Sequence, residues 1–357
     1  MATATIVDKP VGAIGYGLMG LTWTMTNPNL PPAAESYELM NLALAQGANF
    51  FNGGEIYSNA DGRNSCDLLR EFFTANPGAA SKVVLSIKGG TKSATTMDPD
   101  GSEANARRTV DDSLAKLGGT KTIDVFQYAR VDHSTPIEEV MGHLKKLVSE
   151  GKIGGVGLSE VRASTIERAA KVVPIAAVEI ELSLWTTNTL RNGVAETCAR
   201  LGIPIVAYAP LARGVLAGGA EKILEQLKQL PENDWRRHLP KFQDDVVQQN
   251  LRLTKEVEAL AAKKGVKPGV IAINWVRLLS GRRMQVLDAD GNEKTVTMPT
   301  VIPIPGTTNR ERLVDNSTIV DLSEDEMKEI DAILEKNPVV SIIRLCFSSW
   351  SWPAHEI

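Results

Sequence analysis

The chain has 357 residues, of which 43% are hydrophobic and 23% are charged, as in an ordinary globular protein. A net charge of -4 and the lack of a long basic run argue against nucleic acid as a partner. Three widely spaced cysteines and four scattered histidines form neither a disulfide framework nor a metal-ligand motif, so we expect no metal.

The first residues lack the charged region and apolar core of a signal peptide, and no stretch is long enough to span a membrane. We therefore expect a cytoplasmic protein in a reducing compartment, without a membrane partner. No composition break divides the chain, so we expect residues 1–357 to form a single domain. The oligomeric state is left open.

Apolar runs that predict strands alternate with amphipathic stretches that predict helices. The expected strands are Val11–Gly15, Ala48–Phe51, Val83–Ile87, Ile123–Tyr128, Ile153–Gly157, Ile175–Glu179, Ile203–Ala207 and Thr300–Ile304. The expected helices are Glu35–Gln46, Glu103–Leu117, Ile137–Ser149, Ser164–Val172 and Leu190–Leu201. Eight strand–helix units, each of roughly 30–45 residues, predict an α/β fold of the (β/α)8 TIM-barrel type.

Three stretches depart from this alternation. Ala217–Asp244 is expected to be a long loop across the mouth of the barrel. In Ser280–Pro299, the turn signal Asp288–Asn292 lies between Met284–Leu287 and Lys294–Met298 and predicts a hairpin insertion before the last barrel strand. After a C-terminal helix, the aromatic tail from Ser341 is either a lid over the mouth or a strip docked on the barrel wall.

The stretch Gly15–Gly20 matches the Gly-x-Gly-x-x-Gly pattern of dinucleotide-binding domains. That pattern requires a helix at the turn, whereas the proline-containing stretch Leu21–Pro32 cannot form a regular helix. A doubly wound nucleotide-binding domain is therefore disfavoured. The glycines more readily allow a close backbone turn at the first strand end, with Thr22 and Trp23 facing the mouth.

Two strand ends carry residues suited to proton transfer. Tyr57 follows an apolar strand and a glycine turn, and Lys88 ends the next apolar strand along the chain. Chemistry in a parallel α/β barrel takes place at such strand ends, so we expect the two side chains to lie side by side. The ordinary pKa of tyrosine is about 10, and a neighbouring ammonium favours the phenolate and makes the phenol a usable proton donor.

Strand alternation tests this expectation. If Lys88 points into the barrel, then Ser86 and Val84 also point inward, while Val83, Leu85 and Ile87 face the helices. Asn52, two residues before the strand-end glycine Gly54, is either a turn former or a hydrogen-bond partner.

From Gly15 to about Glu335 the chain resembles the aldo-keto reductases. The resemblance rests on blocks that occur in the family's order, at residues 15–20, 50–57, 123–132, 153–160, 206–216 and 304–313. The variants Asn-Gly-Gly-Glu in the second block and Ala-Arg-Val-Asp in the third are most similar to the fungal pyridoxal reductase branch.

The resemblance implies NADPH-dependent reduction of an aldehyde or ketone to an alcohol, with Tyr57 as proton donor and Lys88 as the charge that lowers its pKa. Asn52 stands where the family has an aspartate that pairs with the lysine, so we expect the pKa of Lys88 to fall for want of a carboxylate partner. Ala129 stands where the family has a histidine that orients the carbonyl. Its loss would cost on the order of 10²-fold in rate.

Two neighbours of Ala129 are alternatives for the missing donor. Arg130 would reach the mouth only if the strand has ended, and His133 fits better as part of a turn before a helix. The implied substrate contacts are Trp23, Ala129 and Arg130. An anionic substrate would require basic residues at the mouth, for which Arg130, Arg236 and Arg237 are candidates.

The resemblance also implies the cofactor contacts. Tyr208 would stack on the nicotinamide, and Ser159, Glu160 and Glu179 stand where the family holds the carboxamide with polar side chains. They belong to an implied cofactor-binding set made up of Gly20, Thr22, Trp23, Ser159, Glu179, Tyr208, Pro210, Leu211, Arg213, Gly214, Ile304, Gly306, Thr308, Arg312 and Asn316.

The last of the family blocks favours NADPH over NADH. The turn Gly306–Thr308 leads into a predicted helix, whose free amides make a phosphate seat. Arg312, with Arg310 as its neighbour, would grip a 2′-phosphate. Asn316 fits an adenine contact, with Asp315 beside it as a second candidate. Arg213 would either approach the pyrophosphate or lie on the loop surface.

Two alternatives remain open. The substrate is either a pyridoxal-like aldehyde or a carbonyl compound of fungal secondary metabolism, and the direction of the reaction in the cell is not fixed by the sequence. In a different class, the chain would be a cofactor-binding regulatory subunit of the potassium-channel β type with weak turnover.

Overall fold

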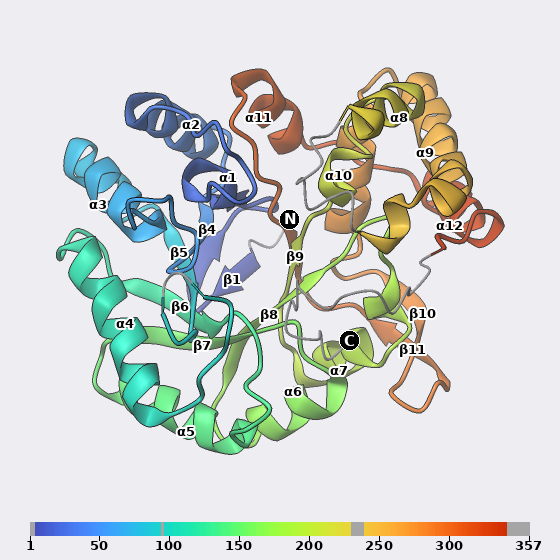
Figure 1. Ribbon diagram of the computed structural model, residues 1–357. Helices are drawn as coiled ribbons and strands as arrows, with labels where there is room; N and C mark the ends of the chain where they lie inside the picture. The colour runs from blue at the N-terminus through green and yellow to red at the C-terminus, as the bar shows by residue number, and fades with distance from the viewer. Residues whose placement is uncertain (1–3, 94–95, 230–238, 341–357) are drawn as a thin grey trace.

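The computed structural model describes residues 4–93, 96–229 and 239–340. Within them, parallel strands form an 8-stranded sheet in the order β12-β9-β8-β7-β6-β5-β4-β3 (Figure 1). These strands are β3 (Tyr16–Gly17), β4 (Phe50–Gly54), β5 (Val84–Gly89), β6 (Ile123–Tyr128), β7 (Ile153–Ser159), β8 (Ile175–Glu181), β9 (Ile205–Tyr208) and β12 (Val301–Pro303).

Backbone hydrogen bonds join the two ends of this sheet. The Gly15 amide donates to the Pro303 carbonyl at 2.9 Å, and the Gly17 amide donates to the Pro305 carbonyl at 3.3 Å. The sheet therefore curls round into a TIM-type barrel, as the alternation of strands and helices predicts.

Helices surround the sheet (Figure 1). Those that follow barrel strands are α2 (Ala33–Ala45), α3 (Ser65–Ala75), α4 (Glu103–Leu117), α5 (Ile137–Ser149), α6 (Ala163–Ala170), α7 (Val194–Leu201), α10 (Pro268–Leu278) and α11 (Arg310–Ser317). The others are α1 (Met19–Thr22), α8 (Ala220–Lys228), α9 (Asp244–Lys264) and α12 (Glu324–Lys336), with short 3-10 turns at Pro77–Ala79, Asn188–Leu190, Ala212–Gly214 and Pro240–Phe242.

The barrel interior is apolar at the amino-terminal ends of its strands. Phe50, Val84 and Val125 form one cluster there with inward residues of β8, β9 and β12. By contrast, Val83, Leu85 and Ile87 pack in the separate core between the sheet and the helices. The predicted alternation of the strand that carries Lys88 is therefore confirmed.

An N-terminal hairpin closes the apolar end. It consists of β1 (Ala4–Ile6) and β2 (Lys9–Val11), and its Ile6 and Val11 are buried in the interior cluster. The expected strand Val11–Gly15 is therefore wrong: only Val11 is in a strand, and the first barrel strand is β3. A Cβ on Gly12 would lie 2.0 Å from the Gly47 carbonyl oxygen, so the backbone after Val11 packs too closely against the loop at Gly47 for any residue but glycine.

The hairpin insertion is confirmed. β10 (Arg283–Leu287) and β11 (Glu293–Thr297) pair antiparallel before β12, and the hairpin packs beside α7, where the Gly193 amide donates to the Leu287 carbonyl at 3.1 Å. The expected long loop Ala217–Asp244 is wrong in part, because its residues with high helix propensity form α8. Residues 230–238, with Arg236 and Arg237, and the aromatic tail 341–357 lie outside the described residues.

A different sheet order would be needed for the doubly wound domain that the glycine motif suggests. The helix that follows Gly17 is only the four-residue α1, and the strands close into a barrel. Among the helices of the described residues, none is both long enough and apolar enough to cross a membrane.

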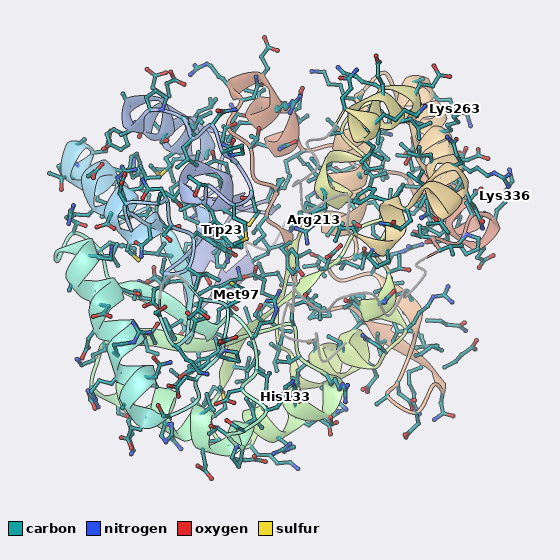
Figure 2. All side chains as sticks on the ribbon, viewed as in Figure 1. Trp23, Met97, His133, Arg213, Lys263 and Lys336 are labelled. Carbon is teal, nitrogen blue, oxygen red and sulfur yellow. The ribbon has the colours of Figure 1, made fainter. Side chains whose placement is uncertain are left out.

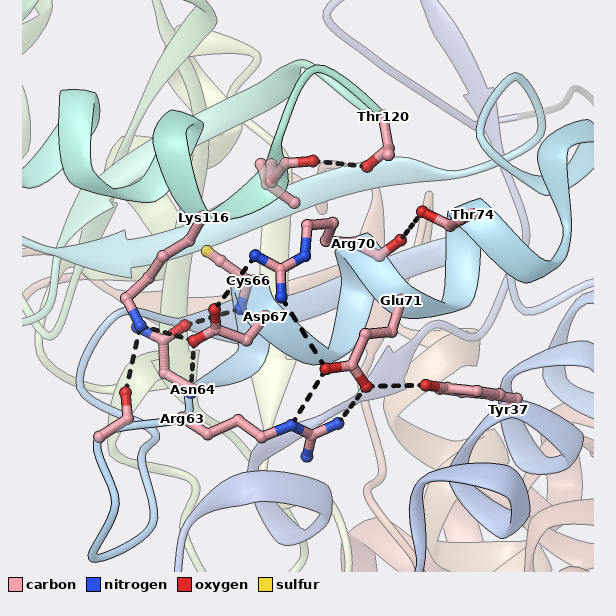
Figure 3. A network of polar contacts seen from close by, with 12 residues as sticks. Tyr37, Arg63, Asn64, Cys66, Asp67, Arg70, Glu71, Thr74, Lys116 and Thr120 are labelled. Carbon is pink, nitrogen blue, oxygen red and sulfur yellow. Dashed lines mark hydrogen bonds and ion pairs between the residues drawn. The ribbon is translucent and has the colours of Figure 1, made fainter.

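Polar contacts fix the start of α3 and the loop before it (Figure 3). The side-chain oxygen of Asn64 accepts from the backbone amide of Cys66 at 3.0 Å, and the Asp67 carboxylate accepts from the backbone amide of Asn64 at 3.1 Å. These two bonds make a capping box. The side-chain nitrogen of Asn64 also donates to the backbone carbonyl of Glu55 at 3.0 Å. The helix cap thus anchors the loop that leaves β4.

This double role predicts an unequal cost for removing two caps. Asn64→Ala should lower the free energy of unfolding by about 2 kcal/mol, since it loses both a cap and a buried bond to the loop. Ser323→Ala, which removes only the exposed capping box of α12, should cost about 1 kcal/mol. Urea unfolding of both variants measures the difference, and equal losses would contradict a role of Asn64 in holding the loop.

Candidate active site

Tyr57 and Lys88 meet at the carboxyl ends of the barrel strands. Lys88 pairs in register with Gly54, the last residue of β4, and Tyr57 lies in the loop just beyond it. The Lys88 Nζ is 5.7 Å from the centroid of the Tyr57 ring. Both side chains are buried, with exposed fractions of 5% and 8%. The structure therefore brings together the two residues that the sequence singles out.

Glu55, the first residue of the loop between β4 and α3, holds this loop in place. Its amide donates to the Lys88 carbonyl at 2.7 Å, which ties the loop to β5. Its carboxylate accepts from Arg108 at 2.7 Å and from the Thr109 hydroxyl, both on α4. A Cβ on Gly54 would lie 3.0 Å from the Tyr57 ring, so glycine at this position leaves room for the phenol.

Lys88 has a carboxylate partner from the opposite part of the barrel wall. Its ammonium forms an ion pair with Glu179 of β8 and donates to the Asn52 side-chain oxygen at 2.8 Å. The Asn52 amide group donates in turn to Glu179 at 2.7 Å. A fourth residue, Gln127 of β6, donates to the same Glu179 oxygen at 2.5 Å. All four residues are buried.

The acid–base state of Lys88 follows from this network. Burial by itself lowers the pKa of the ammonium, but the charge of Glu179, together with Tyr57 and hydrogen bonds to both, outweighs burial and raises the pKa above its usual value. The expectation that this pKa falls because Asn52 replaces an aspartate is therefore wrong. The carboxylate is present, but it comes from another strand.

Sequence reasoning missed Gln127 and the contact of Glu179 with Lys88. Strand parity carried a signal for both, since Val125 and Ala177, two residues earlier on the same strands, point into the barrel. Space for Gln127 comes from Gly157 on the neighbouring strand, where a Cβ would lie 3.1 Å from the Gln127 side-chain oxygen.

An apolar cluster lies beside the phenol. Trp23, Ile56, Tyr57 and Ala129 pack together, with Met19 and Met97 against them. The Trp23 and Tyr57 ring centroids are 5.1 Å apart, with the planes inclined by 33°. Figure 2 shows Trp23 and Met97 near the middle of the barrel. The position that the resemblance assigns to a histidine is thus part of an apolar wall.

The two alternatives for the missing donor occupy different settings. His133 lies in a turn before α5, where Asp132 accepts from the Ser134 amide at 2.8 Å and from the Thr135 hydroxyl at 2.9 Å. The turn interpretation is confirmed, and Figure 2 shows His133 further out, toward α6. Arg130 follows the end of β6 and donates to the Ala129 carbonyl at 2.5 Å.

The implied cofactor positions lie along one rim. They are in or just beyond β7, β8, β9 and β12, in α1 after β3, and in α11. Among the described residues, the Ser159 hydroxyl is buried without a hydrogen-bond partner. Ser159 pairs in register with Glu179, so this free hydroxyl lies beside the Lys88 network. An unpaired buried hydroxyl suits a polar ligand group such as a carboxamide.

Tyr208 and Arg213 form a second group on the rim. The Arg213 guanidinium lies 5.4 Å from the Tyr208 ring centroid and pairs with Glu181 at 3.1 Å. Burial and the neighbouring carboxylates Glu160 and Glu181 raise the pKa of Tyr208 well above its usual value. Tyr208 therefore stays a neutral phenol over the physiological range and presents a ring, not an acid.

The turn before α11 is exposed and backed by the first strand. Tyr16 donates its hydroxyl to the Thr307 carbonyl at 2.7 Å, and a Cβ on Gly306 would lie 2.8 Å from the Gly17 carbonyl oxygen. Asn309 caps α11 by accepting from the Arg312 amide at 2.9 Å.

Side chains around this turn differ in exposure. Arg310 and Arg312 are exposed, and Asn316 is buried. Asp315, the second adenine candidate, pairs with Lys267 at 2.6 Å. The arrangement fits a phosphate group at the turn, flanked by two arginines whose side chains reach solvent.

Within the described residues, no group of three or more His, Cys, Asp or Glu side chains is arranged to hold a metal ion.

The chain is similar to known proteins in sequence and in fold. The sequence profile of the Aldo/keto reductase family matches residues 13–335. The probable pyridoxal reductase 2 of Schizosaccharomyces pombe is 39% identical over 337 residues, which is 93% of this chain and 94% of that protein. The structure of a glycerol dehydrogenase from Gluconobacter oxydans has the same fold, with a TM-score of 0.76 and 24% identity over 98% of this chain and 100% of that chain.

Arg107 and Arg108 are adjacent on α4 and allow a matched test of whether Glu55 supports the β4–α3 loop. Glu55→Gln should lower the free energy of unfolding by about 2 kcal/mol, because Arg108 then loses a buried charge partner. Glu150→Gln, which removes the exposed partner of Arg107, should have little measurable effect. Denaturant unfolding compares the two variants, and an equally small loss for both would show that Glu55 does not support the loop.

Proposed function

Because this chain belongs to the aldo/keto reductase family, we propose that it reduces a small aldehyde or ketone to the alcohol at the Tyr57–Lys88 site. The observation that carries this proposal is the buried Lys88 ammonium 5.7 Å from the Tyr57 ring centroid at the mouth of the barrel. A positive charge in this place stabilises the phenolate that remains when a phenol gives up its proton.

NADPH is the proposed cofactor and, when bound, supplies the hydride that the carbonyl carbon receives. Ser159, with its unpaired buried hydroxyl, would hold the carboxamide, and the Tyr208 ring would lie against the nicotinamide. The turn before α11 would bind phosphate through its exposed amides. Arg312, an exposed arginine at the start of α11, would pair with the 2′-phosphate, which is the reason to prefer NADPH over NADH.

Tyr57 donates the proton that the carbonyl oxygen needs to become a hydroxyl. Lys88 stays next to the phenol and can return a proton to it from solvent after each turnover. In the pocket wall formed by Trp23, Ile56 and Ala129, an alanine stands at the position of the family's histidine donor. Tyr57 is therefore the main group that polarises the carbonyl oxygen. The same apolar wall excludes water, which strengthens the field of the ammonium.

A flat aromatic aldehyde of the pyridoxal type is the proposed substrate class. The tilted Trp23–Tyr57 pair offers a flat apolar wall to an aromatic ring. The relative from Schizosaccharomyces pombe is described as a probable pyridoxal reductase, which supports the same choice.

Replacement of the phenol tests the reaction. Tyr57→Phe should lower kcat with pyridoxal by at least about 10²-fold, because the proton donor is lost while the ring and its packing remain. NADPH consumption, followed by absorbance, measures the rate, and quenching of protein fluorescence by NADPH checks that the cofactor still binds. If the wild-type protein binds NADPH tightly but reduces none of a broad panel of carbonyls, the regulatory-subunit alternative holds instead.

Cofactor choice has its own test. Arg312→Ala should raise the KM for NADPH about tenfold or more and leave that for NADH nearly unchanged, because only NADPH carries the 2′-phosphate. Arg310→Ala, two residues earlier on the same exposed helix start, is the matched control and should have a smaller effect. Equal changes for both cofactors in Arg312→Ala would contradict the assignment.

A further inference from the structure

The Lys88 ammonium is a buried cation that needs a negative charge nearby. A charge removed from water is stable only when it is paired and hydrogen-bonded. Asn52 offers a neutral oxygen at 2.8 Å, which satisfies one N–H of the ammonium but cannot balance its charge. The charge balance must therefore come from elsewhere on the barrel wall.

We propose that Glu179 is a positioning residue of the reaction, which supplies from β8 the negative charge that keeps Lys88 protonated and directed at Tyr57. The inference rests on the proposed function and deepens it. Glu179 forms the ion pair with Lys88 and is itself 2% exposed, so solvent does not screen the pair. It acts through Lys88 and does not itself touch the reacting carbonyl.

The residue type that suits position 52 depends on the residue at position 179. The Asn52 side chain accepts from Lys88 with its oxygen and donates to Glu179 with its nitrogen. Only an amide can do both, since an ionised carboxylate has no donor. A carboxylate at position 52 beside Glu179 would place two negative charges in contact, and a neutral residue at both positions would leave Lys88 without any. One carboxylate and one amide are therefore required around this lysine.

This role leaves Glu179 little capacity for the cofactor. One of its oxygens pairs with Lys88, and the other accepts from both Asn52 and Gln127. An ionised carboxylate has about four lone-pair sites, and three of them are in use. The carboxamide contact that the family resemblance implies for Glu179 then falls mainly to its register neighbour Ser159, whose hydroxyl is unpaired within the described residues.

In the part of the chain that the structure describes, the ionisable groups that face the ammonium are Glu179 from β8 and Tyr57 from the β4–α3 loop. Asn52 from β4 faces it as a neutral group, and Gln127 from β6 reaches it only through Glu179. Removal of the Glu179 charge leaves burial as the main influence on Lys88, so the pKa of Lys88 should fall.

The test moves the carboxylate from one side of Lys88 to the other. Glu179→Gln should lower kcat about tenfold or more and shift the alkaline limit of kcat down by about one pH unit or more, with little change in NADPH affinity. The double variant Asn52→Asp with Glu179→Gln should return the alkaline limit toward the wild-type pH. Gln127→Met removes a hydrogen bond to Glu179 but no charge, and should leave that limit in place.

A turnover-independent readout separates this inference from the proposed function. The pKa of Lys88, followed by NMR from the side-chain carbon next to its amine and assigned with a Lys88→Met control, should be lower in Glu179→Gln than in the wild type and should recover in the double variant. If the wild type reduces no carbonyl but this titration behaves as expected, the function proposal fails while the role of Glu179 stands.

Two results would overturn the role of Glu179. One is an unchanged alkaline limit together with an unchanged pKa of Lys88 in Glu179→Gln. The other is a loss confined to NADPH affinity, which would make Glu179 a cofactor contact instead. If Glu179→Gln does not fold, the double variant decides: a wild-type alkaline limit supports the proposal, and a folded double variant with a lowered limit contradicts it.

Discussion

The ion pair between Lys88 and Glu179 is the interaction on which the mouth of the barrel depends. It spans the interior from β5 to β8, so it couples two strands that are not neighbours in the sheet. Two neutral amides, Asn52 and Gln127, complete the hydrogen bonds of the carboxylate. A buried pair of this kind contributes little net stability compared with an apolar replacement. Its presence at the carboxyl ends of the strands, next to the Tyr57 phenol, is therefore better explained by chemistry than by folding.

The barrel separates these roles along its axis. At the amino-terminal ends of the strands, the interior is filled by aliphatic and aromatic side chains, and at the carboxyl ends it is filled by the polar network. The same alternation that directs Phe50 inward directs Asn52 inward two residues later. An apolar layer thus lies next to the charged groups on the amino-terminal side, and the bonds of Glu55 and Asn64 fix the β4–α3 loop on the other side. Tyr57 is part of this fixed loop.

Much of the fold could be predicted from the sequence, because strands and helices alternate with clear glycine and proline ends. Helices such as Glu103–Leu117 have the predicted bounds. The first strand differs from the prediction because Val11 belongs to β2 of the N-terminal hairpin, and the barrel strand starts only at Tyr16. Tyr57 and Lys88 could be chosen from strand ends and the family resemblance. The contact of Glu179 with Lys88 could not, since it joins residues from distant strands and depends on how far two side chains reach across a closed ring.

The hairpin of β1 and β2 closes the barrel at the end opposite the mouth. Ile6 and Val11 enter the interior there, and Lys9 pairs with Asp124, whose carboxylate also accepts from the Leu85 amide at 2.7 Å. Because Ile6 and Val11 fill the interior at that end, a small molecule reaches Tyr57 and Lys88 by way of the carboxyl ends of the strands. Traffic of substrate and product through this fold is thereby confined to a single direction along the barrel axis.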